Sequence, residues 1–271
     1  MKVKIMEELK KIENTYHVKV LYACESGSRA WGFPSKDSDY DVRFIYIHLR
    51  DWYLSIDQKR DVIELPINDL LDINGWELTK ALRLYRKSNP PLLEWLHSGI
   101  VYYQAFSVIK EMKQLSDKVY KPAACLHHYL NMAKGNYRDY LQNEQVKIKK
   151  YFYVLRPILA CKWIKKFNTI PPLEFQSLLE EIVPDGLLKK EIQELLERKK
   201  RGDELDFEPR IDSINQFVET EIEHLTQYAK SLDIQLEDPT QSLDQLFRDA
   251  LHEVWGNEDV QKTKMRKAAP N

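Results

Sequence analysis

Residues 22–43, which read YACESGSRAWGFPSKDSDYDVR, decide the fold that the sequence predicts. A Gly-Ser pair at residues 27–28 is separated by ten residues from an Asp-Tyr-Asp triplet at residues 39–41. One apolar run precedes the pair, at residues 18–23, and another begins within the triplet, at residues 40–47. Both runs are typical of buried strands. The sequence therefore predicts a Gly-Ser turn between two neighbouring strands.

The two acids of the triplet are candidate metal ligands. Side chains alternate along a strand, so Asp39 and Asp41 project to the same face. Two neighbouring carboxylates repel each other unless a cation lies between them, and Mg²⁺ prefers carboxylate oxygens. Gly27 lets a ligand approach the backbone, while Ser28 and the following N–H groups can donate to phosphate oxygens, with Arg29 adding a charged fork. The alternative is a surface turn whose acids are merely solvated.

Composition limits the classes of protein that fit. The 271 residues allow one large domain or two of ordinary size, and a hydrophobic fraction of 43% suffices for a core. Lys and Arg number 41 against 42 Asp and Glu, so no overall basic charge indicates a nucleic-acid partner. The three cysteines, Cys24, Cys125 and Cys161, are spaced neither for a disulfide framework nor for zinc. With no signal peptide or apolar run of about 20 residues, the sequence predicts a cytoplasmic protein with no membrane partner.

The hydrophobic periodicity predicts an α+β protein, in which a small mixed sheet is followed by helices. Besides the two strands above, we expect helices at residues 1–14, 76–88 and 91–97 and strands at residues 61–67 and 100–103, with Asp72 or Asn74 capping the second helix. Further helices are expected at residues 107–117, 123–142, 146–166, 173–183, 187–200, 211–231 and 242–255. We assign residues 1–105 to a catalytic domain, 106–255 to a helical nucleotide- or substrate-binding domain and 256–271 to a flexible tail.

A third carboxylate on a neighbouring strand would complete a metal site. Glu64 lies between Ile63 and Leu65, so alternation places its side chain opposite theirs. Glu64 is therefore the third candidate ligand, Asp61 is the fallback, and Asp69 and Asp72 are next in line. The alternative is a glutamate exposed on an edge strand.

One helix of the second domain carries a candidate nucleotide-binding face. Lys149, Tyr153 and Arg156 lie at positions i, i+4 and i+7, hence on one side of the helix expected at residues 146–166. Such a face can bind a triphosphate and stack on a nucleobase. The alternative is that the lysines extend over tyrosines of the core.

The spacing Gly27-Ser28-x10-Asp39-x-Asp41 resembles the signature of the DNA polymerase β-like nucleotidyltransferases, in which the Asp-x-Asp strand binds two metal ions. Together with residues 75–82, 87–96 and 149–157, it makes the chain similar to a family of bacterial and phage nucleotidyltransferases assigned to RNA repair. The resemblance covers residues 22–183. Where that family often has proline before the fourth strand, this chain has Gly99, which affects a turn and not the chemistry.

The resemblance implies that a substrate hydroxyl attacks the α-phosphorus of a nucleoside triphosphate such as ATP and releases pyrophosphate. It implies two Mg²⁺ ions, or Mn²⁺ in their place, held by Asp39, Asp41 and Glu64. Nucleotide binding would fall to Gly27, Ser28, Arg29, Lys149, Tyr153 and Arg156. The acceptor can be an RNA end, a protein or a small molecule. A protein-adenylylating or antitoxin-like enzyme fits the same ligands, whereas a non-catalytic nucleotide-binding module would be expected to lack one of the acids.

Overall fold

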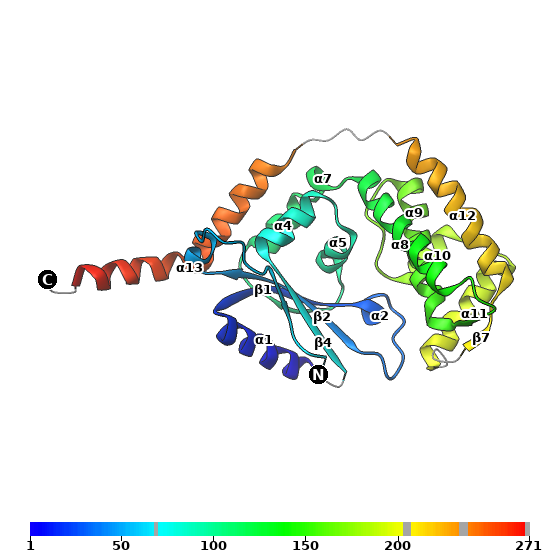
Figure 1. Ribbon diagram of the computed structural model, residues 1–271, viewed down its shortest axis with the longest axis horizontal. Coiled ribbons are helices and arrows are strands. Elements are labelled where there is room, and N and C mark those ends of the chain that lie inside the picture. The colour runs from blue at the N-terminus through cyan, green and yellow to red at the C-terminus, as the bar shows by residue number, and fades with distance from the viewer. Residues whose placement is uncertain (68–69, 203–206, 233–237, 269–271) are drawn as a thin grey trace.

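The two strands around the Gly-Ser turn lie at the centre of a five-stranded mixed sheet (Figure 1). The computed structural model describes residues 1–67, 70–202, 207–232 and 238–268, with side chains as far as residue 256. The strands are β1 (Val18–Ser26), β2 (Tyr40–His48), β3 (Val62–Glu64), β4 (Leu71–Glu77) and β5 (Val101–Gln104), in the order β3-β4-β2-β1-β5. β1 is antiparallel to β2 and β5, while β2 and β4 are parallel. The structure confirms the predicted α+β class.

Strand β4 was not predicted from the sequence. Asp72 was expected to cap a helix, but it lies in β4, and helix α4 (Leu78–Arg86) begins later with Glu77 as its N-cap. Along β4, buried Leu71 and Ile73 alternate with the partly exposed side chains between them. The parallel pairing with β2 brings Asp72 directly opposite Asp41.

Helices cover both faces of the sheet (Figure 1). Helix α1 (Lys2–Tyr16) buries Ile5, Leu9 and Ile12 against one face, in a cluster that includes Val42 and Phe44 of β2. Because side chains alternate, Ile45 and Ile47 point to the other face. There they pack with α4 and with α5 (Pro90–His97), in a core that continues into the later helices. Asp41 and Arg43 share this second face, at the end of β2 where the strand begins.

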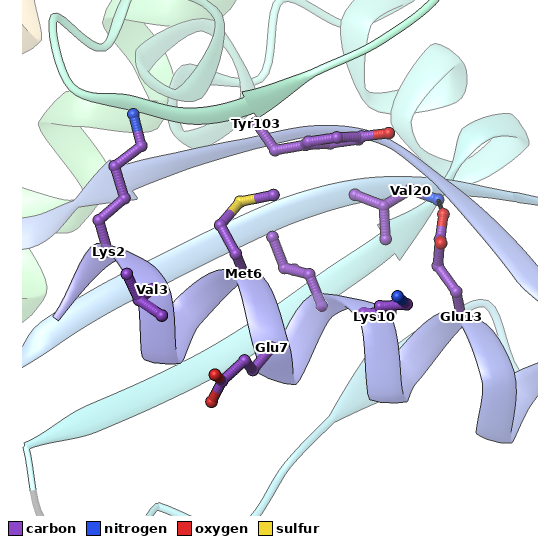
Figure 2. Close-up of a pocket in the computed structure, with 9 residues that line it drawn as sticks. Lys2, Val3, Met6, Glu7, Lys10, Glu13, Val20 and Tyr103 are labelled. Atoms are coloured by element: carbon purple, nitrogen blue, oxygen red, sulfur yellow. Dashed lines mark hydrogen bonds between the residues drawn. The ribbon is translucent and has the colours of Figure 1, made fainter.

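Figure 2 shows a cavity of about 590 Å³ between α1 and the edge strand β5. Met6 of α1 and Tyr103 of β5 lie on opposite sides of it, while Glu7 points away. The carboxylate of Glu13 accepts a hydrogen bond from the backbone N–H of Val20 (2.9 Å) at one end. This cavity lies on the face of the sheet opposite Asp41.

The chain beyond residue 106 is largely helical, as expected. Its helices are α6 (Val108–Gln114), α7 (Ser116–Val119), α8 (Pro122–Tyr140), α9 (Ile148–Phe167), α10 (Phe175–Ile182), α11 (Leu187–Arg201), α12 (Asp212–Lys230) and α13 (Thr240–Ala268). Short strands β6 (Gln145–Lys147) and β7 (Phe207–Pro209) pair with each other, so α9 begins after β6 and not at residue 146. Two further single turns, α2 (Gly27–Ala30) and α3 (Arg50–Tyr53), belong to the sheet region.

Helix α13 differs most from its prediction. It packs beside α4, with the Phe247 ring 5.0 Å from that of Tyr53, and then projects from the molecule (Figure 1). Residues 256–268, expected as a tail, continue this helix, and residues 269–271 lie outside the described part. The boundary between the two assigned domains stays a prediction. In the described part of the chain, no helix combines the length and apolar character needed to span a membrane.

Candidate active site

The Gly-Ser turn places the backbone against a carboxylate. Gly27 opens the single turn α2 and has a φ of 65°, a conformation that favours glycine. A Cβ at this position would lie 2.1 Å from Asp41 Oδ2. Glycine is therefore needed here for two reasons, since its backbone conformation and its contact with Asp41 both exclude a side chain.

Asp41, Asp72 and Arg43 form a charged cluster at the adjacent ends of β2 and β4. Arg43 Nη2 lies 3.1 Å from Asp41 Oδ1 and 2.8 Å from Asp72 Oδ2. Burial raises the pKa of Asp41 above its ordinary value, Arg43 opposes that rise, and the charges of Asp72 and Asp39 add to it. Asp41 is therefore a crowded carboxylate whose main compensation within the chain is one guanidinium.

The loop before β2 is held by Arg29. Its Nη2 donates to the carbonyl of Ser38 (2.7 Å), its Nε donates to the carbonyl of Asp39 (3.1 Å), and its guanidinium lies 3.8 Å from the centre of the Tyr40 ring. These contacts fix the backbone that carries Asp39. In the structure the guanidinium of Arg29 positions this loop, and its expected contact with phosphate stays a prediction.

The structure does not bring Glu64 to Asp39 and Asp41. Glu64 pairs with Asn74 across β3 and β4, and its carboxylate accepts hydrogen bonds from Arg60 (2.6 Å) and Asn74 (3.0 Å). It does share a face of the sheet with Asp41, as alternation predicted. However, β4 lies between β3 and β2, and neighbouring strands are about 4.8 Å apart, so about two strand spacings separate Glu64 from the strand of Asp41.

Asp72, which the sequence offered as a third ligand only after Glu64 and Asp61, is the carboxylate that lies directly opposite Asp41. The alternation of Leu71 and Ile73 with polar neighbours was the sequence signal that could have identified its strand. The fallback candidate, Asp61, is held instead by Lys80 (3.0 Å) at the other end of the sheet. Asp69 lies outside the described residues.

A cleft of about 480 Å³ lies between this end of the sheet and the helical region. Asp37, Asp39 and Asp41 lie on the sheet side, and Lys149 and Tyr153 of α9 lie on the other. The structure thus brings two of the three predicted acids, Asp39 and Asp41, to the same cleft as two of the three predicted α9 residues. The lining residues are Ser26, Gly27, Ser28, Trp31, Phe33, Asp37, Ser38, Asp39, Asp41, Arg43, Lys149, Tyr153 and Lys199.

Arg156, the third predicted residue of α9, does not line the cleft. It is buried, with its guanidinium 4.5 Å from the centre of the Trp31 ring and its Nη2 3.0 Å from Glu94. Seven residues along a helix correspond to about 10 Å, so Arg156 lies two turns past Lys149. Its guanidinium packs against the ring of Trp31, a residue that does line the cleft.

Lys199 is a cleft residue that the sequence did not single out. It lies in the last turn of α11, is buried, and places its Nζ 5.5 Å from the centre of the Phe33 ring. It is one of four consecutive basic residues at 198–201, near the end of the helix expected at residues 187–200. Only the packing of α11 distinguishes the residue that faces the cleft from its neighbours.

A model of the RNA repair pathway DNA polymerase beta family matches residues 1–249. The chain belongs to this family. It is similar to the uncharacterized protein YcgL of Bacillus subtilis (strain 168), with 60% identity over 255 residues that make up 94% of this chain and 98% of that protein. A nucleotidyltransferase-like protein from Exiguobacterium sibiricum 255-15, known from a crystal structure, is 14% identical, with a TM-score of 0.33 over 92% of this chain and 80% of its own.

Membership of this polymerase beta family implies divalent metal ions, and the donor set suits them. Asp39, Asp41 and Asp72 supply carboxylate oxygens at one end of the sheet, and Gly27 leaves room for the Asp41 carboxylate. Nevertheless, no three His, Cys, Asp or Glu side chains of the described residues are grouped closely enough to hold a metal as they stand. The cation between Asp41 and Asp72 is the guanidinium of Arg43.

Proposed function

We propose that this member of the polymerase beta family is a nucleotidyltransferase that transfers a nucleoside monophosphate from a triphosphate to an acceptor hydroxyl and releases pyrophosphate. One observation carries the proposal. The cleft has carboxylates on its sheet side and lysines on its helical side, with Asp39 and Asp41 across from Lys149 and Lys199. A metal-bound triphosphate needs acids for the metal and cations for the phosphates, and this separation supplies both.

Asp39 and Asp41, with Asp72 beside them, would hold the metal ions. When bound, divalent ions lower the pKa of an attacking hydroxyl and neutralise the charge of the leaving pyrophosphate. This chain's own part is to fix the carboxylates. Arg29 holds the backbone of Asp39, and Gly27 lets the Asp41 carboxylate pack against the turn.

The remaining cleft residues would bind the nucleotide. Lys149 and Lys199 would pair with phosphate oxygens, and Ser28 would donate its hydroxyl to them. Tyr153 has 37% of its surface exposed and lines the cleft, which suits stacking on the base. Trp31 closes the cleft from the side that Arg156 supports.

We propose an RNA end as the acceptor. The family's description names RNA repair. A second cavity of about 370 Å³ shares Lys149 with the cleft. On it, Lys150 lies 3.6 Å from the centre of the Tyr140 ring and Lys147 lies 4.8 Å from that of Phe207, whose surface is 65% exposed. Exposed rings among lysines suit stacked bases and phosphates of a single strand.

The test is to incubate the protein with each α-³²P-labelled nucleoside triphosphate, Mg²⁺ and a panel of RNA, protein and small-molecule acceptors. We expect label on RNA, and none with a variant carrying Asp39→Asn and Asp41→Asn. Label on protein alone would overturn the RNA assignment and favour an adenylylating enzyme. Nucleotide binding with no labelled product from any acceptor would indicate a non-catalytic binding module.

A further inference from the structure

Arg43 occupies the position between the two carboxylates of neighbouring strands. The same nitrogen, Nη2, contacts Asp41 Oδ1 at 3.1 Å and Asp72 Oδ2 at 2.8 Å. The other terminal nitrogen, Nη1, donates to the carbonyl oxygens of Val42 (3.1 Å) and Asp72 (3.2 Å). Four acceptors therefore anchor one guanidinium, which lies where an ion bridging Asp41 and Asp72 would also lie.

The Asp41 carboxylate has little freedom to move away from this position. Its Oδ2 is packed so close to Gly27 that a Cβ there would lie 2.1 Å away. Its backbone N–H donates to the buried carboxylate of Glu25 (2.8 Å), which accepts a further hydrogen bond from Tyr102. A cation that approaches Asp41 thus meets a carboxylate that is fixed on one side and already paired on the other.

A divalent ion and the guanidinium cannot share these oxygens. Mg²⁺ binds carboxylate oxygen at about 2.1 Å, well inside the distances at which Arg43 now lies. A positive charge left within a few ångströms would repel the ion strongly in this partly buried setting. Binding of an ion to Asp41 Oδ1 and Asp72 Oδ2 therefore requires Arg43 Nη2 to leave these oxygens.

We propose that Arg43 is a positioning residue, a resident counter-cation that holds Asp41 and Asp72 in the metal-free protein and that a divalent ion must displace. The inference rests on the proposed function and concerns the same site. In the metal-free protein, Arg43 keeps the two carboxylates facing each other. The same contacts lower the affinity of the site for a metal ion in the absence of nucleotide. Arg43 also lines the cleft, so the displaced guanidinium stays on the wall that faces a bound triphosphate.

The experiment measures Mn²⁺ affinity without nucleotide, by electron paramagnetic resonance of the free ion, in the full-length protein and in Arg43→Met. We expect Arg43→Met to bind Mn²⁺ about tenfold more tightly, because competition from a neighbouring charge is removed. Thermal unfolding gives a second readout. The metal-free variant should melt below the wild-type protein, and Mn²⁺ should raise its melting temperature by more than it raises that of the wild type.

Arg60→Met is the matched control. Arg60 pairs with Glu64, a carboxylate on the same face of the sheet, and its substitution by Met removes the same charge as Arg43→Met does. It should leave Mn²⁺ affinity within about twofold of the wild-type value, because exposed pairs act weakly at a distance. A tighter affinity in both variants would trace the effect to net charge and overturn the inference.

Two other results also decide the matter. Equal or weaker Mn²⁺ binding by Arg43→Met overturns the inference about Arg43. If the wild-type protein binds Mn²⁺ in that case and Asp41→Asn does not, the proposed function still stands. Absence of Mn²⁺ binding in every variant, with or without a triphosphate, overturns both. Should Arg43→Met fail to fold, Arg43→Gln removes the charge but keeps a hydrogen-bond donor, and Mn²⁺ affinity equal to wild type would then overturn the inference.

Discussion

The two ends of the parallel β2–β4 pair each carry a carboxylate, and the two are used differently. At one end Asp72 lies opposite Asp41, and at the other Glu77 lies opposite Tyr46. Glu77 is completely buried and accepts hydrogen bonds from the backbone N–H of Thr79 (2.7 Å) and the hydroxyl of Tyr53 (2.6 Å). As the N-cap, Glu77 stabilises the start of α4 by accepting the hydrogen bond from Thr79.

Asp41 instead faces other acids. The charges of Asp72 and Asp39 act on it together with the single guanidinium of Arg43. An acid that serves the fold is surrounded by donors, whereas acids placed side by side raise the free energy of the folded state unless a cation joins them. From this comparison we propose that the Glu77 end serves structure and the Asp41 end serves ligand binding, and each variant below tests that division.

The largest effect is expected from Asp41→Asn. Loss of a metal ligand should lower the rate of transfer by at least about a thousandfold, equivalent to about 4 kcal/mol. The melting temperature should stay unchanged or rise, because one of several repelling charges is removed. Single-turnover rates and thermal melts of the same preparation measure both. If the variant unfolds, Asp41 has a structural role like that of Glu77, and the proposed difference between the two ends is wrong.

Glu77→Ala should show the opposite pattern. Removing the N-cap leaves buried donors unpaired and should lower the free energy of unfolding by about 2–4 kcal/mol. Urea titration measures this loss, and Glu77→Gln, which keeps an acceptor oxygen, should lose less. The fraction that remains folded should transfer nucleotide at the wild-type rate. A stable Glu77→Ala protein without activity would contradict the structural assignment.

Asp72→Asn and Glu64→Gln sharpen the comparison within the sheet. Asp72 is next to Asp41, so we expect its variant to lose about a hundredfold in rate, or about 2.7 kcal/mol. Glu64 is exposed and bound to Arg60, so its variant should stay within about twofold of wild type, as exposed ion pairs contribute little. Steady-state kinetics at saturating Mg²⁺ compare them. The reverse order would restore Glu64 as the third ligand.

The local parts of the site could be predicted from the sequence. Asp39 and Asp41 are two residues apart on one segment, and the turn at Gly27 joins adjacent strands, so spacing alone fixes their relation. Asp72 could not be placed in this way. Its position depends on the register between β2 and β4, which tertiary packing sets across some thirty residues of sequence.

The helical side of the cleft shows the same limit. The periodicity of α9 indicated that Lys149 and Tyr153 share a face, but it could not indicate where along α9 the cleft ends. Arg156 lies beyond that point, beneath Trp31. Lys199 comes from a helix whose basic residues look alike in sequence, and its position in the cleft lining beside Phe33 identifies it.

The smallest effect concerns Tyr153. Stacking on a base contributes about 1–3 kcal/mol, so Tyr153→Ala should weaken triphosphate and monophosphate binding alike by about tenfold. Because the Tyr153 side chain is partly exposed, the melting temperature of Tyr153→Ala should differ little from that of the wild-type protein. Arg156→Met is the comparison variant, since breaking its buried pair with Glu94 should lower the melting temperature by more than Tyr153→Ala does and weaken nucleotide binding by less. Nucleotide titrations and thermal melts measure the two effects. A large drop in melting temperature with unchanged affinity in Tyr153→Ala would show that Tyr153 has only a structural role.

The most direct test of the central claim compares label from two positions of one nucleotide. Parallel reactions would contain the protein, Mg²⁺, an RNA acceptor and a triphosphate labelled with ³²P at either the α- or the γ-phosphate. Nucleotidyl transfer at the Asp39 and Asp41 site predicts that α-label enters the acceptor, that γ-label leaves as pyrophosphate, and that Asp41→Asn abolishes both. Transfer of γ-label to the acceptor, or release of γ-label as inorganic phosphate without α-labelled product, would contradict it.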